Sequence, residues 1–565
     1  MPTRTQPSPT RGRSLAVSLA RAALVAVVVC AVLPAVLGAQ VRIPDEALPD
    51  NGELQRVLAK GHELESQHRW GEALAHYEHA LREHPDERSL QERLTYARIH
   101  FDIGRRYQDE SFLATLRELN ERRAADLYAE VLRKIHLHYV KEPNWQEISR
   151  RGLASLNTAL SRSSFQKQHG LTASDAGITR FCDEMQRRMD VTVIRNREQA
   201  GQAAATVARQ AAEQLTLRPE ACLIEFTCGA ICALDEYSSF LTGGQLEEVF
   251  SQIEGNFVGL GIELKAHDDS LSVVSVIPGS PAEAAGIRGG DRIVEVDGSA
   301  TANVTTDEAA NLLKGREGSQ VHLTVVDPSG RARQMDIIRR RVEVPSVEDA
   351  RIVDPEYGTG YVRLAGFQKT TSRDVDAALW RLHRAGMRSL VIDLRGNPRG
   401  LLTAAVDLAD KFVASGNIVA TRGRSPQEDF DYRARTGGTW QMPLAVLIDG
   451  ETASASEIFA GAVRDHHRGT VIGQRSYGKG SVQGIFPLTT VKAGVRLTTA
   501  KFYSPSGQPI TNRGVFPDVV VQTVKKPAVA AAGADRKLQP EEDTVLAAAL
   551  QFMRSRLTQR RPARQ

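Results

Sequence analysis

Residues 443–488 have the sequence PLAVLIDGETASASEIFAGAVRDHHRGTVIGQRSYGKGSVQGIFPL, and the organisation of the chain follows outward from them. The apolar run 444–448 has the length of a buried strand and ends at Asp449. Apolar residues then recur at helical spacing as far as Val463, which predicts a helix that begins near Ser454. Ser454 therefore lies at a strand-to-helix turn, where the unpaired N–H groups of the helix start could bind an oxyanion.

A lysine follows in a loop that is flanked by glycines. After a second predicted strand, 470–473, the loop 476–480 carries Lys479 between two glycines. A serine attacks an acyl carbon only when a neighbour takes its proton, and a lysine can do so if burial lowers its pKa. Ser454 and Lys479 are therefore a candidate nucleophile and base. The alternative is that Ser454 only caps a helix and Lys479 is a solvated charge.

The spacing of these residues resembles that of the carboxyl-terminal processing proteases, also called tail-specific proteases. Their S-A-S-E motif is followed, 25 residues after its first serine, by F/Y-G-K-G-x-x-Q. Here Lys479 follows Ser454 by 479 − 454 = 25 positions, and Gln483 lies four residues further on. The resemblance implies that Ser454 is the nucleophile, Lys479 the general base and Gln483 the residue that orients the lysine. It also implies an α/β core of the crotonase/Clp-like type, with a mixed sheet and covering helices, and neither a cofactor nor a metal.

The loop after another predicted strand, 389–394, resembles the family motif D-L-R-x-N-P-G-G, whose glycine pair supplies an oxyanion-hole N–H. Arg399 and Gly400 take the places of that pair, and with Ala455 they are the candidate oxyanion donors. If position 399 needs a positive φ, its side chain costs on the order of 1–2 kcal/mol. Loss of one donor slows such enzymes about 100- to 1,000-fold. The alternative function is therefore a catalytically weak scaffold that binds partners.

Residues 251–345 resemble a bacterial PDZ domain, a β-sandwich or barrel module. The resemblance rests on an ordered series, GNFVGLGI (255–262), PGSPAEAAGI (278–287) and GDRIVEVDG (290–298). It implies that an apolar C-terminal tail of a polypeptide substrate adds a strand to the sheet edge. A helix at about 306–314 would form the other wall of the groove, and a PDZ fold kept as a spacer is the alternative. The implied carboxylate-binding residues are Gly259, Leu260, Gly261 and Ile262.

The N-terminus predicts export. Arginines precede an apolar run, 22–37, so residues 1–39 are typical of a signal peptide with cleavage after Ala39. Leu37 is larger than the residue usually found three positions before a cleavage site, so an uncleaved membrane anchor is the alternative. No other window has the length to span a bilayer. We expect a periplasmic or cell-envelope protein, with membrane contact only through an uncleaved signal.

The helical segments before the PDZ-like module divide into two regions. Residues 40–120 contain a register that resembles the second half of a tetratricopeptide repeat, which predicts either an arm that binds a protein partner or a helical cap. Residues 121–250 resemble the helical start of the protease family, with an insertion at about 162–218 before ALDEYSSFL (233–241). The repeat-like register comprises Trp70, Gly71, Ala73, Tyr77, Ala80, Leu81 and Pro85.

The protease core is predicted at 346–525, followed at 526–565 by a linker and a short C-terminal helix. Strands and helices alternate in this core, which favours a mostly parallel sheet covered by helices. We therefore expect an exported Ser/Lys endopeptidase that finds substrates by their C-terminal tails. A related alternative is an enzyme that stays inactive until a tail docks in the PDZ groove.

Composition excludes some other functions. A net charge of +4, from 72 basic and 68 acidic residues, gives no nucleic-acid signature. A Ser-His-Asp triad with Asp465 and His466 or His467 is disfavoured, because those residues end the helix that starts at Ser454, roughly 18 Å away. Four cysteines remain after the signal and could form one or two disulfides or stay as buried thiols, and their spacing is no zinc pattern: Cys182, Cys222, Cys228 and Cys232.

Overall fold

The structure of the chain, a computed structural model, describes residues 51–559 except 268–269, 303–308, 310–311, 436, 438 and 523–542. The predicted signal, 1–39, and the predicted linker, 526–537, lie outside the described residues. Among those that are described, no helix has the length and apolar content needed to cross a membrane. The chain divides into two compact units, Met1–Lys60 and Gly61–Gln565, and the second holds all the sheets.

The first part of the described chain is helical, as predicted. Several of its helices begin behind an Asp, Asn or Ser whose side chain accepts a hydrogen bond from a first-turn N–H, for example Asn144 before α6 and Ser174 before α8. The helices are α1 (Asn51–Ser66), α2 (Trp70–Glu83), α3 (Arg88–Arg106), α4 (Glu110–Glu118), α5 (Glu121–His138), α6 (Trp145–Leu160), α7 (Ser163–His169), α8 (Asp175–Val191), α9 (Arg197–Leu215), α10 (Pro219–Cys232) and α11 (Gly243–Glu254).

One apolar core joins the helices from α3 to α10. Ile103 of α3, Phe181 of α8 and Phe226 of α10 are fully buried in the same cluster. The predicted insertion at 162–218 is therefore α7, α8 and α9, which pack into this core. Because α3 also packs there, the part of the repeat-like region at Arg88–Arg106 lies against the helices that follow. Its tetratricopeptide character and its binding of a partner stay predictions.

The protease-like core contains a six-stranded sheet in the order β10-β11-β12-β15-β16-β19. Only the β10 edge pairs antiparallel, so the predicted mostly parallel sheet is confirmed. The strands are β10 (Val347–Asp354), β11 (Thr359–Leu364), β12 (Ser389–Asp393), β15 (Leu444–Ile448), β16 (Thr470–Gly473) and β19 (Val519–Val520).

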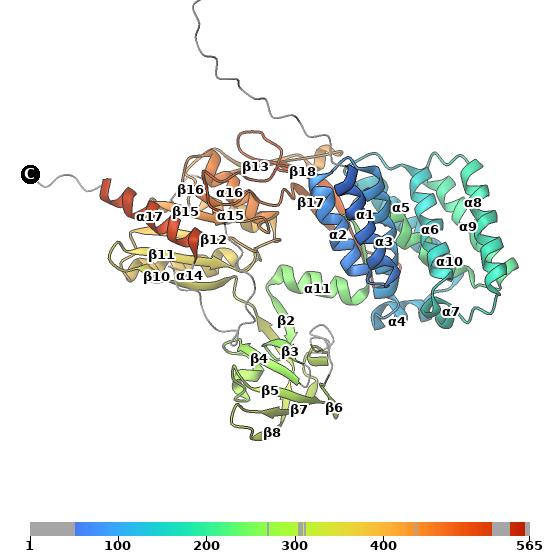
Figure 1. The fold of residues 1–565 in the computed structure, drawn as a ribbon, viewed down its shortest axis with the longest axis horizontal. Coiled ribbons are helices and arrows are strands. Elements are labelled where there is room, and N and C mark those ends of the chain that lie inside the picture. Colours follow the sequence, from blue (N-terminus) through green and yellow to red (C-terminus); the bar gives the residue numbers. More distant parts are fainter. Residues whose placement is uncertain are drawn as a thin grey trace, which may run out of the picture. The chain divides into compact units, whose positions relative to one another are not determined.

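Helices cover both faces of this sheet (Figure 1). Successive side chains of β15 point to opposite faces. Val446 packs in the core formed with α14 (Thr371–Arg384), α15 (Leu402–Asp410) and α16 (Ala455–Asp465). Leu447 packs in the core formed with the C-terminal helix α17 (Thr544–Gln559). Burial on both faces explains why β15 is a continuous apolar run.

A second, antiparallel sheet has the order β1-β18-β13-β14, with β17 also paired to β18. Its first strand, β1, comes from the segment that follows α10, so the helical region contributes directly to the sheet beside the protease core. The strands are β1 (Ser239–Leu241), β13 (Asn417–Gly423), β14 (Phe430–Arg433), β17 (Ser481–Pro487) and β18 (Gly494–Tyr503).

The PDZ-like residues form their own antiparallel sheet around a separate apolar core. The sheet has the order β3-β4-β5-β7-β8, and β6 pairs with β5. A separate two-stranded sheet pairs β2 with β9, the first and the last strand of the module. The elements are β2 (Asn256–Gly259), β3 (Ile262–His267), β4 (Ser270–Val276), α12 (Pro281–Ala284), β5 (Arg292–Val296), β6 (Ser299–Ala300), β7 (Gln320–Val326), β8 (Ala332–Ile338) and β9 (Arg340–Glu343).

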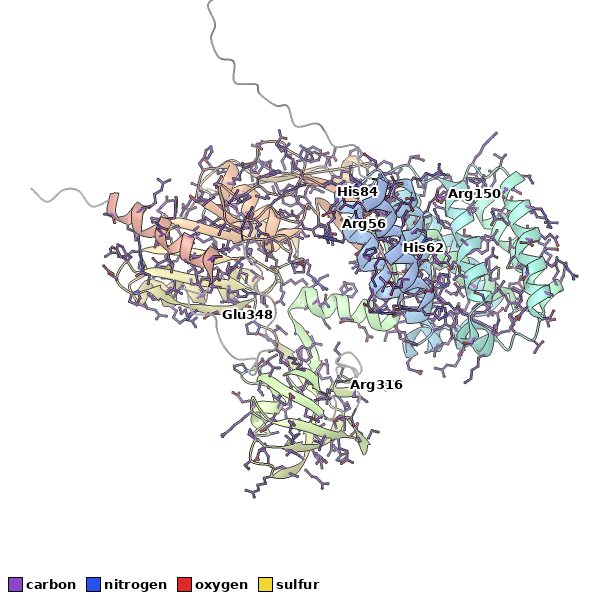
Figure 2. The ribbon with its side chains drawn as sticks, in the orientation of Figure 1. Arg56, His62, His84, Arg150, Arg316 and Glu348 are labelled. Carbon is purple, nitrogen blue, oxygen red and sulfur yellow. The ribbon has the colours of Figure 1, made fainter. Side chains whose placement is uncertain are left out.

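Charged side chains such as Arg56, Arg150 and Glu348 are exposed and project from the ribbon in Figure 2. The sequence left open whether the cysteines form disulfides or remain thiols. In the structure the described cysteines are free thiols: Cys182, Cys222, Cys228 and Cys232. Burial raises the pKa of Cys182 and of Cys232 to about 11. These thiols are therefore protonated and unreactive at neutral pH.

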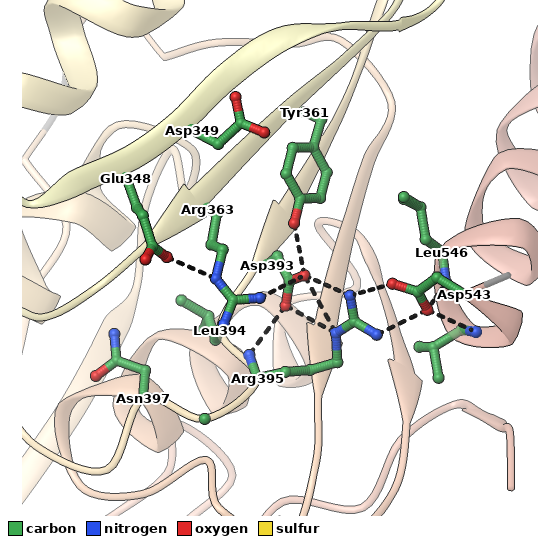
Figure 3. A network of polar contacts seen from close by, with 12 residues as sticks. Glu348, Asp349, Tyr361, Arg363, Asp393, Leu394, Arg395, Asn397, Asp543 and Leu546 are labelled. Atoms are coloured by element: carbon green, nitrogen blue, oxygen red, sulfur yellow. Dashed lines mark hydrogen bonds and ion pairs between the residues drawn. The ribbon is translucent and has the colours of Figure 1, made fainter. Parts of the chain in front are cut away.

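The C-terminal helix is tied to the loop after β12 by a charged network (Figure 3). Asp393 is fully buried and accepts hydrogen bonds from Tyr361 Oη at 2.8 Å and from Arg395 Nη2 at 2.6 Å. Arg395 also donates to both carboxylate oxygens of Asp543, at 2.8 and 2.7 Å. Asp543 in turn caps α17 by accepting from the N–H of Leu546 at 3.0 Å. The start of α17 and the 395–400 loop are thus fixed to each other.

Asp543 offers a test of this anchor. Although burial opposes the effect, hydrogen bonds from Arg395 and the backbone lower the pKa of Asp543. Its stabilising contribution is therefore present above the pKa of an unfolded Asp and is lost as the pH falls. We expect Asp543→Ala to lower the free energy of unfolding by about 2–3 kcal/mol, because both the ion pair and the cap are lost.

Asp543→Asn is the matched control, since asparagine keeps the cap, and we expect it to lose about 1 kcal/mol. Urea unfolding of the three proteins at pH 7 makes the comparison. Equal stability of Asp543→Ala and the unmodified protein would show that α17 is held by its apolar face alone.

Candidate active site

Ser454 lies where the sequence predicts it, between the end of β15 and the start of α16. The turn is shaped by Asp449, whose Oδ1 accepts from the N–H groups of Glu451 and Thr452, each at 3.0 Å. Ser454 itself has φ 59° and ψ −117°, a conformation that side-chain-bearing residues rarely adopt. Such strain costs on the order of 1–3 kcal/mol and persists only where the surroundings impose it.

One buried carboxylate joins the Ser454 turn to the Lys479 loop. Glu457 is fully buried, and its Oε2 accepts from Ser454 N at 2.8 Å and from Lys479 N at 2.9 Å. Its Oε1 accepts from Ser476 Oγ at 2.6 Å and from Gly478 N at 2.7 Å. Burial raises the pKa of Glu457, and these four hydrogen bonds oppose that rise. The Glu457 carboxylate therefore fixes the backbone at Ser454 and the backbone at Lys479 relative to each other.

Lys479 is half-buried, and its Nζ lies 4.8 Å from the ring centroid of Tyr237. Within the described part of the chain it makes no ion pair. Burial, followed by the positive charges of Arg496 and Arg399, lowers the pKa of Lys479. A lysine with a lowered pKa and no carboxylate partner has the properties that a general base at neutral pH requires.

Gln483 lies on β17, just beyond the lysine loop. Its Nε2 donates to Thr498 Oγ1 at 2.9 Å and to Ser481 Oγ at 3.2 Å. Its Oε1 is buried and accepts no hydrogen bond from the residues described. No hydrogen bond to Lys479 is present among those residues, but the unused oxygen is an acceptor of the kind that would orient an ammonium group. The orienting role stays a prediction.

In the candidate oxyanion loop, position 400 is the one that requires glycine. Gly400 has φ 150°, and a Cβ placed there would lie 2.3 Å from Phe367 Cβ and 2.8 Å from Phe367 O. Arg399 is not among the residues with positive φ, so the backbone strain considered for it does not arise. Its side chain instead donates from Nη1 to Gln252 Oε1 at 3.3 Å. The Arg399 departure from the family motif is thus tolerated by the backbone.

Asn397 connects this loop to the serine turn, a role that the sequence analysis missed. Its carbonyl oxygen accepts from Ala453 N at 3.1 Å and from Ser456 Oγ at 3.0 Å. Its side-chain Nδ2 donates to Leu364 O at 3.1 Å, and the residue is almost fully buried. The asparagine of the motif D-L-R-x-N was the available signal. The 395–400 loop and the start of α16 are therefore held side by side.

Gly400→Ala should displace the oxyanion loop from Phe367. We expect kcat to fall about 100- to 1,000-fold, the loss typical for one oxyanion donor. Gly396→Ala is the matched control, because Gly396 also has a positive φ, 68°, but a Cβ there meets nothing within 4 Å. Steady-state kinetics on an unstructured polypeptide measure both variants. Equal kcat values for the two would mean that the 400 position does not set the reaction geometry.

Arg496→Gln tests the electrostatic influence on Lys479. Loss of the positive charge raises the pKa of Lys479, so less of the neutral amine is present at a given pH. The acidic limb of the pH profile of kcat should therefore move to higher pH by about one unit, with activity recovered at alkaline pH. A limb that stays in place would show that Arg496 does not act on the base.

The other candidates of the sequence analysis lie elsewhere. His466 follows the far end of α16, and its Nε2 lies 2.6 Å from Asn417 O, so the Ser-His-Asp alternative is wrong. Among the residues described, no group of three His, Cys, Asp or Glu side chains could hold a metal ion.

The predicted carboxylate-binding loop of the PDZ-like module connects β2 to β3. Gly261 has φ 80°, and a Cβ there would lie 2.3 Å from Ser280 Cβ. Leu260 O accepts from Ala282 N at 3.0 Å, which fixes the loop against α12. The binding of a peptide carboxylate by Gly259, Leu260, Gly261 and Ile262 stays a prediction.

The helical cap also reaches the catalytic loop. The guanidinium of Arg82, in α2, lies 4.1 Å from the ring centroid of Tyr477, two residues before Lys479. The sequence analysis assigned α2 to a possible interaction arm and gave no signal for this contact. The contact adds to the cap interpretation of the region.

Two parts of the chain match known protein families. Residues 358–521 match the family described as peptidase family S41, and residues 272–327 match the PDZ domain. The chain is 39% identical over 301 residues to the carboxy-terminal-processing protease of Bartonella bacilliformis, covering 52% of this chain and 68% of the relative. It is 36% identical over 293 residues to the carboxyl-terminal-processing protease of a Picosynechococcus species, covering 51% and 70%.

Among solved structures, the photosystem II D1 C-terminal processing protease is similar, at 26% sequence identity and a TM-score of 0.36. The aligned region covers 70% of this chain and 93% of the chain of that solved structure. The assignment of the chain to a family rests on the sequence matches and not on this structural similarity.

Proposed function

Because the chain belongs to the carboxy-terminal-processing proteases of peptidase family S41, which are serine-type peptidases, we propose that it is an exported endopeptidase with a Ser454/Lys479 dyad. In this proposal Lys479 is the general base, and Gln483 orients it through its unused Oε1. The N–H groups of Ala455, Arg399 and Gly400 receive the oxyanion. The PDZ loop 259–262 binds the C-terminal carboxylate of a substrate with an apolar tail.

The reaction follows from these roles. The neutral Lys479 amine takes the Ser454 hydroxyl proton as Oγ bonds to the scissile carbonyl carbon, and the carbonyl oxygen becomes an oxyanion. When the tetrahedral intermediate collapses, the C–N bond breaks and the Lys479 ammonium returns the proton to the departing amine. Water then attacks the acyl-enzyme carbonyl carbon as Lys479 takes one of its protons. When this second intermediate collapses, the bond between that carbon and Ser454 Oγ breaks, Lys479 returns the proton to Oγ, and the second product leaves as a carboxylic acid.

The Glu457 carboxylate is the observation that carries the proposal. It accepts from both Ser454 N and Lys479 N, so the strained serine turn and the lysine loop share one buried anchor. A helix cap and a solvated loop lysine would need no such common anchor. Lys479 itself is half-buried with a lowered pKa, which a structural surface lysine has no reason to be.

Export is proposed from the N-terminal sequence, where basic residues precede the apolar run 22–37. A periplasmic or cell-envelope location would bring the protein to exported polypeptides. For the tetratricopeptide-like helices, the role of a cap is favoured over that of an arm that binds a protein partner, because α3 packs in the common helical core.

Cleavage of an unstructured polypeptide that ends in apolar residues tests the proposed function. We expect internal fragments in mass spectrometry from the unmodified protein, faster for the free C-terminal acid than for the amidated polypeptide. The Ser454→Ala protein should leave both polypeptides intact. Absence of any fragment from the unmodified protein would support the scaffold alternative instead.

A further inference from the structure

Arginines line a cavity beside the candidate active site. The cavity has a volume of about 420 Å³ and is bounded by α3, α10, the segment from β1 into α11, the 395–400 loop and β18. Its described acidic lining residues are Asp102 and Glu248. Its basic lining residues are Arg98, Arg105, Arg106, Arg399 and Arg496. The lining therefore carries an excess of positive charge.

Two of these arginines have partners within the fold. Arg106 forms a buried ion pair with Glu225. Arg98 donates to Asp235 O at 2.6 Å and also contacts Ser238 O, and its Nε lies 3.9 Å from Asp102. Both side chains thus hold the wall of the cavity together, and their charges are partly compensated.

The other three arginines have no ion-pair partner, although the negative charge of Asp102 offsets part of the repulsion on Arg496. Arg105, Arg399 and Arg496 form no ion pair with a carboxylate anywhere in the described chain, although all three face one cavity. Burial first, and then neighbouring positive charges, lower the pKa of Arg496; these charges belong to Arg98, Arg399 and Arg105. Like charges brought together in this way repel one another unless an anion lies between them.

The cavity adjoins the reacting groups. Arg496 Nε donates to Tyr237 O at 3.2 Å, and the ring of Tyr237 lies against Lys479 Nζ. Arg399 immediately precedes Gly400 of the oxyanion loop. In the proposed reaction the scissile bond lies beside Gly400, so the substrate residues next to that bond are close to Arg399 of the cavity.

We propose that this cavity is a subsite for a carboxylate of the polypeptide substrate. The proposal rests on the proposed peptidase function. Guanidinium groups bind carboxylates through paired, charge-assisted hydrogen bonds, which makes three arginines without an ion-pair partner a suitable site for that group. The volume is in the range of ligand pockets and admits a side chain or a chain end. The carboxylate belongs either to an acidic side chain near the scissile bond or to a chain terminus.

Three peptides distinguish these sources. All share one apolar tail and one cleavage sequence: the first has glutamate residues beside the scissile bond, the second has glutamines there, and the third repeats the first with an amidated C-terminus. We expect kcat/KM to be about tenfold higher for the glutamate peptide than for the glutamine peptide, chiefly through KM, with a smaller ratio at high salt. A tenfold loss for the amidated peptide that disappears in Arg105→Gln assigns the subsite to the chain terminus instead, whereas a loss that Arg105→Gln leaves unchanged belongs to the proposed PDZ loop.

Arg105→Gln is the informative variant, because Arg105 is exposed and its charge is not among those that act on Lys479. It should reduce the glutamate-to-glutamine ratio several-fold. Arg209→Gln, on an exposed position of α9, is the matched control and should leave the ratio unchanged. Fluorescence anisotropy of the same peptides with the Ser454→Ala protein measures the binding without turnover.

The outcomes separate the two proposals. If the unmodified protein cleaves no peptide, the peptidase function fails, and the anisotropy preference still decides the subsite. If all peptides are cleaved and bound equally, or Arg105→Gln leaves the ratio unchanged, the carboxylate subsite is overturned while the peptidase function stands. Inhibition by inorganic phosphate without any preference among the peptides would also overturn it.

Discussion

Lys479→Met should reduce kcat on an unstructured polypeptide by on the order of 10⁴- to 10⁶-fold. The half-buried amine, with its lowered pKa and no ion pair among the described residues, is the group proposed to take the Ser454 proton. Methionine fills a similar volume but accepts no proton, so the chemical step is lost while the fold is kept. Ser454→Ala should cost about as much, and the double variant little more, because the two residues act as a unit.

Lys479→Arg separates charge from basicity. Arginine keeps the positive charge but stays protonated at neutral pH, so it should be as inactive as Lys479→Met. Lys492→Met, at an exposed lysine that pairs with Glu247, is the control for loss of a lysine and should keep full activity. Turnover by Lys479→Met within about tenfold of the unmodified protein would rule out Lys479 as the base.

Glu457→Ala should have the second large effect, on both stability and rate. It leaves four donors without an acceptor, two of them buried and two half-buried, and each buried one costs about 1–3 kcal/mol when no water replaces the carboxylate. We expect the free energy of unfolding to fall by about 3–5 kcal/mol and kcat to fall by at least about 100-fold, since the serine turn and the lysine loop lose their common anchor. Urea unfolding and steady-state kinetics measure the two effects.

Two controls bracket this prediction. Ser476→Ala removes one of the four hydrogen bonds to Glu457 and also leaves the buried N–H of Val515 without its acceptor, so it should cost about 2–3 kcal/mol with activity largely kept. Glu451→Ala changes an exposed glutamate of the same turn and should change neither the free energy of unfolding nor kcat by much. If Glu457→Ala resembled these controls in rate, the carboxylate would not position the catalytic residues.

The elements that carry the candidate site could be predicted from the sequence. The apolar run 444–448, the helix after Ser454 and the glycine-flanked loop around Lys479 follow from local patterns, and the structure contains each of them. The sheet could also be predicted as mostly parallel, because strands and helices alternate along the chain. Local composition decides these features, so one sequence is sufficient for them.

Contacts between distant segments could not be predicted in this way. A glutamate three residues into a helix is typical of capping, and nothing local indicates that Glu457 also binds the loop at 478–479. The same holds for the stacking of Arg82 on Tyr477 and for the pairing of Arg395 with Asp543. The sequence indicated position 399 as the site of possible backbone strain, whereas the structure requires glycine at position 400. The cause is the close approach of Phe367, a tertiary contact that the local sequence does not indicate.

Intact-protein mass spectrometry after reaction with a fluorophosphonate tests the central claim most directly, because the reagent bonds to a serine only when a base activates it. We expect one adduct on the unmodified protein, located at Ser454 by peptide mapping, and forming faster as the pH rises through the lowered pKa of Lys479. The Lys479→Met protein should remain unlabelled over the same time. Labelling at another serine, or equally fast labelling of Ser454 in Lys479→Met, would contradict the Ser/Lys dyad.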